Sequence, residues 1–182
     1  MKFLQGQEIE QFLREFGDEL AKKFHEPVRV MLIGGAYMIL TQHNRRTTKD
    51  VDIFPLNIPV STQASEETKN FQAAVRAVAR RHGIPKDWLN DVAFSMLGGL
   101  GPEPQLTLWQ TFGMLEIYLP PEDFILALKL FAYRDKDLSD IRALLEALQV
   151  TTREHAQAIA DKYIYQRWQQ EYKLYEALDD LF

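Results

Sequence analysis

The sequence contains no cysteine among its 182 residues. This absence excludes disulfide bonds, a catalytic thiol and every metal site built on thiolates. Chemistry is left to carboxylates, hydroxyls and four histidines, and the spacing of the histidines matches no zinc-binding pattern. We therefore expect any bound metal to be a hard cation held by oxygen atoms.

A long apolar run is also lacking. No segment approaches the ~20 apolar residues that a membrane helix needs, and the opening MKFLQGQEIEQF does not combine a basic start with an apolar core. We expect a cytoplasmic protein with no membrane partner. Basic residues number 21 against 26 acidic ones, a net charge of −5, which argues against coating of nucleic acid through bulk charge.

The apolar residues change their periodicity several times along the chain. Helical spacing between Ile9 and Phe24 is followed by an apolar strand at 28–33 and a second strand at 49–54. The pattern then predicts a helix over 65–82, a loop or short turn at Trp88–Asp91, a hairpin around 111–113 and helices from 120 onward. This order predicts an α+β fold, a single domain over 1–182 with a mixed sheet and helices in 1–119 and a helical part in 120–182.

Asp50 and Asp52 are the first candidate site residues. Carboxylates two apart on a strand point to the same face, so they can hold one or two divalent cations between them. The alternative is an ordinary pair of acids on an exposed strand face.

The residues before the two aspartates favour a phosphate site. Gly34 and Gly35 follow an apolar strand and open a helix, where backbone N–H groups can bind phosphate. A tight turn without a ligand is the alternative for a lone glycine pair. Arg46 and Thr48 then precede Asp50 in the pattern RxTxDxD, and together these features predict a site for a triphosphate and a metal ion.

The segment GGAYMILTQHNRRTTKDVD at Gly34–Asp52 resembles the glycine turn and DxD motif of the DNA polymerase beta nucleotidyltransferase superfamily. With WLND at Trp88–Asp91 and KLFAYRDKDLSDI at Lys129–Ile141, it is similar to a compact bacterial branch related to the AbiEii-type toxin nucleotidyltransferases. The resemblance covers roughly Val28–Leu145. It implies a nucleotidyltransferase-like sheet with flanking helices.

Lys129 is the only charged residue in FILALKLFA, and buried lysines are rare unless they are paired or functional. It either reaches solvent from a core helix or is held inside, aimed at a phosphate or paired with acids. Asp137 and Asp140 lie three apart on a predicted helix and can face one neighbour, or they cap and pair with Arg134 or Lys136. The resemblance implies that Lys129 and one of these aspartates belong to the active site.

Two features depart from the superfamily. Many of its members have a serine after the first glycine, where this chain has Gly35, and a third carboxylate on a later strand. The only candidate here is Glu116, whose strand parity places it on the less apolar face. It either joins the aspartates or is an ordinary exposed strand glutamate.

The preferred hypothesis is transfer of a nucleoside monophosphate from an NTP to a hydroxyl, with Mg²⁺ or Mn²⁺ held by Asp50 and Asp52. The resemblance implies an RNA acceptor such as transfer RNA, or a protein acceptor, and a toxin role with a separate antitoxin protein. The alternatives are a non-catalytic nucleotidyltransferase fold that binds nucleotide or regulates a partner, and a helical interaction protein with an aromatic tail.

Overall fold

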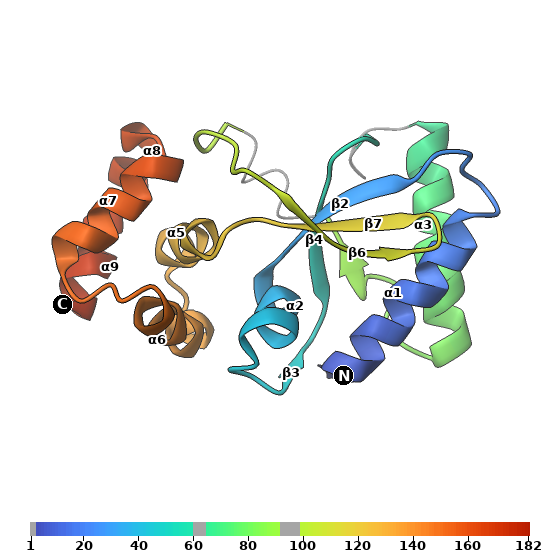
Figure 1. Ribbon diagram of the computed structural model, residues 1–182, viewed down its shortest axis with the longest axis horizontal. Helices are drawn as coiled ribbons and strands as arrows, with labels where there is room; N and C mark the ends of the chain where they lie inside the picture. The colour runs from blue at the N-terminus through green and yellow to red at the C-terminus, as the bar shows by residue number, and fades with distance from the viewer. Residues whose placement is uncertain (1–2, 60–64, 92–98) are drawn as a thin grey trace. The chain divides into compact units, whose positions relative to one another are not determined.

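The computed structural model describes residues 3–59, 65–91 and 99–182. Their contacts group into two compact units (Figure 1). The first unit comprises Met1–Ser95 and Leu106–Leu119, and the second comprises Met96–Gln105 and Pro120–Phe182. The fold class is α+β, as the sequence predicts, with strands in the first unit and helices through the second.

The first unit is built on a mixed five-stranded sheet with the strand order β5-β4-β2-β7-β6. The central strand β2 is antiparallel to β4 and parallel to β7, and the outer pairs are β4 with β5, parallel, and β6 with β7, antiparallel. Five of the six side chains of β2 are buried, which is why this strand reads as a nearly continuous apolar run. The strands are β2 (Val28–Ile33), β4 (Val51–Pro55), β5 (Leu89–Asn90), β6 (Thr107–Phe112) and β7 (Leu115–Leu119).

Two long helices cover this sheet. Helix α1 (Gly6–Leu20) and helix α3 (Glu66–His82) pack against each other, and α1 also contacts β6 and β7 (Figure 1). The apolar stripe of α1 is fully buried, as its helical spacing predicts. Ser65 caps α3 by accepting a hydrogen bond from the Thr68 amide at 3.0 Å, and Gly83 ends the helix at φ +62°.

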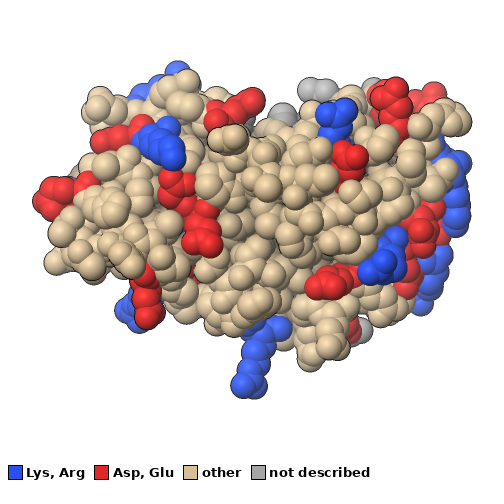
Figure 2. Space-filling model, in the orientation of Figure 1, with Lys and Arg blue, Asp and Glu red and all other residues tan. Residues whose placement is uncertain are grey.

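The outer surface of these helices carries paired charges. Acidic and basic side chains lie next to one another where α1 and α3 run together (Figure 2). Arg81 on α3 donates to Glu15 and Glu19 on α1, at 2.6 Å each. Glu15 and Glu19 are therefore paired across the contact between the two helices.

Short elements connect β2 to β4. Helix α2 (Gly34–Tyr37) continues as a π-helical turn η1 (Met38–Gln42), and β3 (Thr47–Thr48) pairs antiparallel with β1 (Leu4–Gln5) in a small second sheet. The strand, glycine turn and helix predicted from 28 onward are confirmed.

The prediction of a loop at Trp88–Asp91 is wrong in one respect. Leu89 and Asn90 form the edge strand β5, which pairs in parallel with Val51 and Asp52 of β4. Trp88 is buried beside it and donates from its indole nitrogen to the Val75 carbonyl at 3.1 Å. The anchored indole fixes the chain next to β4, so a segment of only two residues can join the sheet.

The second unit is helical. Helix α5 (Glu122–Ala132) contacts α6, α7 and α9 and contributes most of its apolar side chains to the core. The other elements are η2 (Asp135–Asp137), α6 (Leu138–Ala147), α7 (Arg153–Tyr163), α8 (Gln166–Glu171) and α9 (Leu174–Leu181). Within the described residues, no helix combines the length and apolarity needed to cross a membrane.

The contact between α1 and β6 depends on Gly17, because a Cβ at this position would overlap the carbonyl of Phe112. We expect Gly17→Ala to lower the free energy of unfolding by about 1–3 kcal/mol through overpacking, although alanine is the better helix former. Glu10→Ala, on the exposed side of the same helix, is the control and should change stability by less than about 0.5 kcal/mol. Urea unfolding followed by tryptophan fluorescence measures both, and an unchanged midpoint for Gly17→Ala would contradict this account.

Candidate functional site

The glycine turn at the end of β2 lies directly against Asp52. Ile33, the last residue of β2, pairs with Asp52 across the antiparallel ladder. Gly34 follows with φ +68°, and a Cβ on it would overlap the Asp52 carboxylate at Oδ2. Both the backbone conformation and the space therefore require glycine at this position, and the carboxylate is held next to the start of α2.

The second glycine is equally close to β3. A Cβ on Gly35 would lie 2.5 Å from the Thr48 hydroxyl and 3.2 Å from a guanidinium nitrogen of Arg45. Thr48 is buried, with 6% of its surface exposed. The turn is thus enclosed by Asp52 on one side and by Thr48 and Arg45 on the other, so four of the predicted site residues, Gly34, Gly35, Thr48 and Asp52, come together.

Arg46, the predicted phosphate ligand, is exposed, whereas Arg45 lies against the glycine turn. Arg46 and Thr48 are two residues apart, so they would share a strand face only if Arg46 belonged to the same strand. Strand β3 begins at Thr47, so strand parity does not extend to either arginine. The only sequence signal for Arg45 is its place in the pair Arg45–Arg46.

The two aspartates occupy the less buried face of β4. Val51, Ile53 and Pro55 are buried, while Asp50, just before the strand, and Asp52 within it are half-buried. The alternation of β4 is therefore as predicted. Asn90 on β5 pairs in register with Asp52 and donates from Nδ2 to Oδ2 of Asp50 at 3.4 Å.

Asn90 is a site residue that the sequence analysis did not select. It stands in the WLND motif, and its contact with both aspartate positions depends on the short strand β5. An amide beside a carboxylate orients that carboxylate without changing its charge. Asn90 therefore contacts the Asp50 carboxylate from the strand position that is paired with Asp52.

Glu116 does not join this pair. It shares a sheet face with Asp52, but it pairs with Arg29 of β2, whereas Asp52 pairs with Ile33. These positions are four residues apart along β2, about 13 Å at the usual rise of a strand. Glu116 instead accepts a hydrogen bond from the Tyr118 hydroxyl at 3.1 Å and lies 4.0 Å from the Arg29 guanidinium. Across the described residues, no group of three or more histidine, aspartate or glutamate side chains is arranged to hold a metal ion.

The remaining predicted residues form a cluster inside the second unit. Lys129 on α5 is 5% exposed and donates to Asp137 at 2.9 Å and to Asp140 at 2.7 Å. Arg134 also donates to Asp137, at 2.6 Å. Of the interpretations left open by the sequence, the structure contradicts a solvent-reaching lysine and shows pairing with both acids.

The cluster is balanced in charge, with two cations and two carboxylates. Burial alone would raise the pKa of Asp137, but the hydrogen bonds and positive charges of Lys129 and Arg134 outweigh this effect and hold its pKa below the ordinary 3.8. Lys129 on α5 binds Asp137 of η2 and Asp140 of α6, so its ion pairs join α5 to the two elements that follow it. A catalytic role for Lys129, Asp137 and Asp140 stays a prediction.

Comparison of the chain with models of protein families, with curated proteins and with solved structures finds no match. The interpretation of the site therefore depends on its own geometry and on the resemblance of its motifs.

A substitution of Gly34 would combine two costs, the overlap of the new Cβ with Asp52 and the strain of a positive φ. Gly83 provides a comparison in which only the strain is present. Both have positive φ, but nothing lies within 4 Å of a Cβ on Gly83. We expect Gly83→Ala to cost about 1 kcal/mol of stability from strain alone. Gly34→Ala should cost at least about 1 kcal/mol more and shift the ¹³C NMR signal of the Asp52 carboxyl. Equal losses in the two variants, measured by urea unfolding, would refute the close contact.

The lowered pKa of Asp137 predicts a dependence of stability on pH. Ionised Asp137 contributes stability in full above the pKa of the unfolded chain, near 3.8, and this contribution is lost as the pH falls through the lower folded-state pKa. Asp137→Asn should cost roughly 3 kcal/mol at neutral pH and flatten the decline below pH ~4. Urea unfolding followed by the NMR signals of α5 and α6 measures both quantities, with exposed Asp135→Asn as the control. Parallel pH profiles for Asp137→Asn and the wild type would contradict the prediction.

Proposed function

We propose that the first unit is the core of a metal-dependent nucleotidyltransferase, which transfers a nucleoside monophosphate from an NTP to a hydroxyl group. The observation that carries the proposal is the contact between Gly34 and Asp52. It brings a turn without side chains, suited to phosphate, next to a carboxylate suited to a metal ion. A glycine turn needed only to reverse the chain would not have to touch an aspartate.

The donor set fits magnesium or manganese. Asp50 and Asp52 supply hard carboxylate oxygens, and Mg²⁺ typically takes one or two protein carboxylates and completes its shell with water and substrate phosphates. A bound divalent ion would supply charge neutralisation at the triphosphate. Asn90 would keep Asp50 oriented for this role, as its hydrogen bond to that carboxylate indicates.

In the reaction, the acceptor hydroxyl oxygen forms a bond to the α-phosphorus. The bond from this phosphorus to the oxygen bridging to the β-phosphate breaks, pyrophosphate leaves, and the hydroxyl proton passes to water. The protein contributes mainly position and charge. Gly34 and Gly35 leave the backbone of the turn accessible to phosphate, Thr48 packs behind the turn, and Arg45 provides positive charge near it.

The acceptor follows from the resemblance alone, which favours an RNA end such as that of transfer RNA, or a protein hydroxyl. A pairing with an antitoxin protein has the same basis. The assay below therefore offers both acceptor classes.

One observation favours a second function, nucleotide binding without turnover. Glu116 is about four strand residues away from the aspartate pair along the sheet, so the described residues provide two metal-binding carboxylates at this site. A fold of this kind that binds nucleotide and regulates a partner requires no third acid.

The test is transfer of label from each α-³²P-labelled NTP, with Mg²⁺ or Mn²⁺, to total cellular RNA or protein. Asp50→Asn with Asp52→Asn keeps the shape of both side chains and removes both charges, and we expect it to reduce transfer by about 10²–10³-fold or more. Asp18→Asn with Asp87→Asn, at two exposed positions of the first unit, makes the same change in net charge and should retain activity.

The outcomes separate the two functions. Transfer that is lost only in the Asp50 and Asp52 variant supports the enzyme. Metal-dependent binding of nucleotide without transfer supports the regulatory protein. Transfer that survives the double variant, or absence of nucleotide binding in the wild type, contradicts the proposed site.

A further inference from the structure

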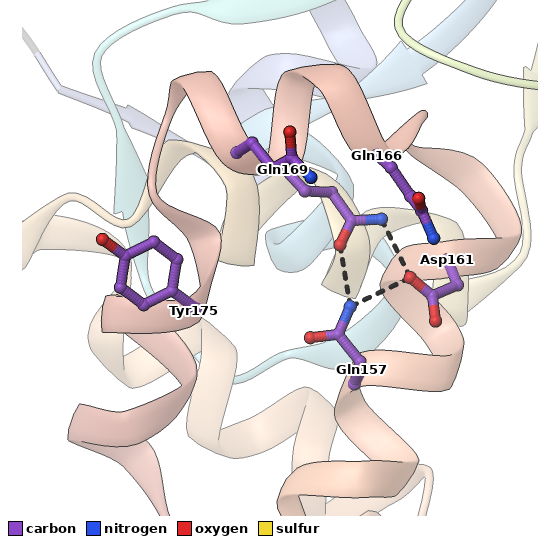
Figure 3. A pocket seen from close by; sticks show the side chains of 6 residues that line it. Gln157, Asp161, Gln166, Gln169 and Tyr175 are labelled. Carbon is purple, nitrogen blue, oxygen red and sulfur yellow. Dashed lines mark hydrogen bonds between the residues drawn. The ribbon is translucent and has the colours of Figure 1, made fainter.

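A polar pocket of about 360 Å³ lies in the second unit, among α7, α8 and α9 (Figure 3). Nε2 of Gln157 donates to Asp161 at 2.9 Å and to Gln169 at 2.7 Å. Nε2 of Gln169 donates to the same Asp161 oxygen at 3.0 Å and to the Ile164 carbonyl at 2.7 Å. The donors of these two amides are therefore used within the unit, where they join α7 to α8. A different polar segment, in the first unit, bears on the proposed site.

The segment from Gly35 to Arg45 returns to its own starting point. Helix α2 and the π-helical turn η1 lead away from the glycine turn, and the chain leaves η1 after Gln42. A guanidinium nitrogen of Arg45 nevertheless lies 3.2 Å from the position of a Cβ on Gly35. Because only His43 and Asn44 separate η1 from Arg45, the chain must turn back within these residues.

His43 makes this turn. Its backbone is left-handed, at φ +52° and ψ +19°, a conformation that histidine and asparagine adopt more often than most residues with a side chain. Its Nδ1 lies 3.0 Å from the Ile39 carbonyl. A carbonyl only accepts, so Nδ1 carries the hydrogen and donates it. His43 therefore combines the reversal of the chain with a side-chain cap on a carbonyl near the end of the helix.

The elements on both sides of this turn are fixed. The Ile39 side chain is 6% exposed, and a Cβ on Gly6 at the start of α1 would lie 3.2 Å from its Cγ2. On the other side, β3 is paired with β1. The chain over 43–46 thus spans two anchored elements, and His43 sets the direction in which it leaves the first. Short π-helical turns such as η1 occur frequently at functional sites.

The distribution of charge makes the placement of a single cation important. The second unit contains 13 acidic and 8 basic residues, whereas the first contains 13 of each. The first unit therefore has no excess positive charge to attract a triphosphate, and Asp50 and Asp52 beside the glycine turn repel one. A guanidinium that is held at the turn offsets this repulsion and binds phosphate through directed N–H donors. Arg45 is the arginine that lies there.

We propose that His43 is a positioning residue, which holds the guanidinium of Arg45 at the glycine turn. The hydrogen bond of its ring to Ile39 fixes the left-handed turn, and the turn directs Arg45 back to Gly35. The consequence for triphosphate binding rests on the proposed function. The placement of Arg45 itself does not, and it can be measured without a nucleotide.

The first test compares NTP binding among variants by isothermal titration calorimetry, with ATP, CTP, GTP and UTP, each with Mg²⁺. His43→Gly keeps the left-handed conformation accessible and removes the ring, and we expect it to weaken binding at least about fivefold. His43→Asn tolerates the same conformation and keeps an N–H donor close to the place of Nδ1, so it should bind within about twofold of the wild type. Gln149→Gly makes the matching change at a left-handed residue of the second unit, φ +54°, and should bind like the wild type.

A double-mutant cycle shows whether His43 acts through Arg45. Arg45→Gln should weaken NTP binding at least about tenfold, and adding His43→Gly to it should change the affinity by less than about twofold. In Arg46→Gln, where the exposed neighbour is replaced, His43→Gly should keep its full effect. A general disturbance of the turn would weaken binding equally in both backgrounds, and that result would overturn the proposal.

The second test needs no nucleotide. In NMR spectra of the full-length ¹⁵N-labelled protein, we expect His43→Gly to shift the backbone amide signal of Gly35 and the Nε–H signal of Arg45, and His43→Asn to restore both. Unchanged signals in His43→Gly would overturn the proposal. Absence of NTP binding in the wild type, together with the expected shifts, contradicts the proposed function and supports the positioning role of His43.

Discussion

The contact between Gly34 and the Asp52 carboxylate is the constraint on which the first unit depends. It requires β2 to end at Ile33, β4 to be in register with it, and the chain to turn with a positive φ at a residue without a Cβ. Thr48 and Arg45 enclose the next glycine from the other side, so the small β1–β3 sheet is also tied to the turn. A shift of one residue in the β2–β4 register would move Asp52 to the buried face of β4, where an unpaired carboxylate is costly.

The second unit contains charged residues that are buried and paired with one another. Its core contains a lysine and two aspartates that are almost entirely removed from water. Each charge is compensated by a direct contact, and Arg134 at the surface completes the balance. Buried ionic groups of this kind add less stability than an apolar core would, but they tolerate few alternative arrangements, since any displacement leaves a charge unpaired. The cluster therefore fixes how α6 lies on α5.

Sequence pattern was sufficient to predict most elements of the fold, because α1, α3 and β4 each bury one face and so repeat apolar residues at a fixed interval, while β2 is buried on both faces and is almost continuously apolar. Strand β5 has two residues and no measurable period, and its place beside β4 depends on the anchoring of Trp88. The position of Arg45 was missed because strand parity ends at Thr47. The pairing of Lys129 remained open in sequence because its partners lie 8 and 11 residues away, on η2 and α6. A left-handed residue, Tyr133 at φ +34°, separates these elements from α5.

The uneven distribution of charge gives the two units different electrostatic fields at long range. The first unit is neutral overall and the second carries the full excess of five negative charges. A polyanion approaching at low ionic strength is repelled by one unit and tolerated by the other, and this sorting acts beyond contact distance, over about 10 Å at 0.1 M salt. Added salt screens the field of each unit and so removes this difference, while the contacts within each unit stay intact.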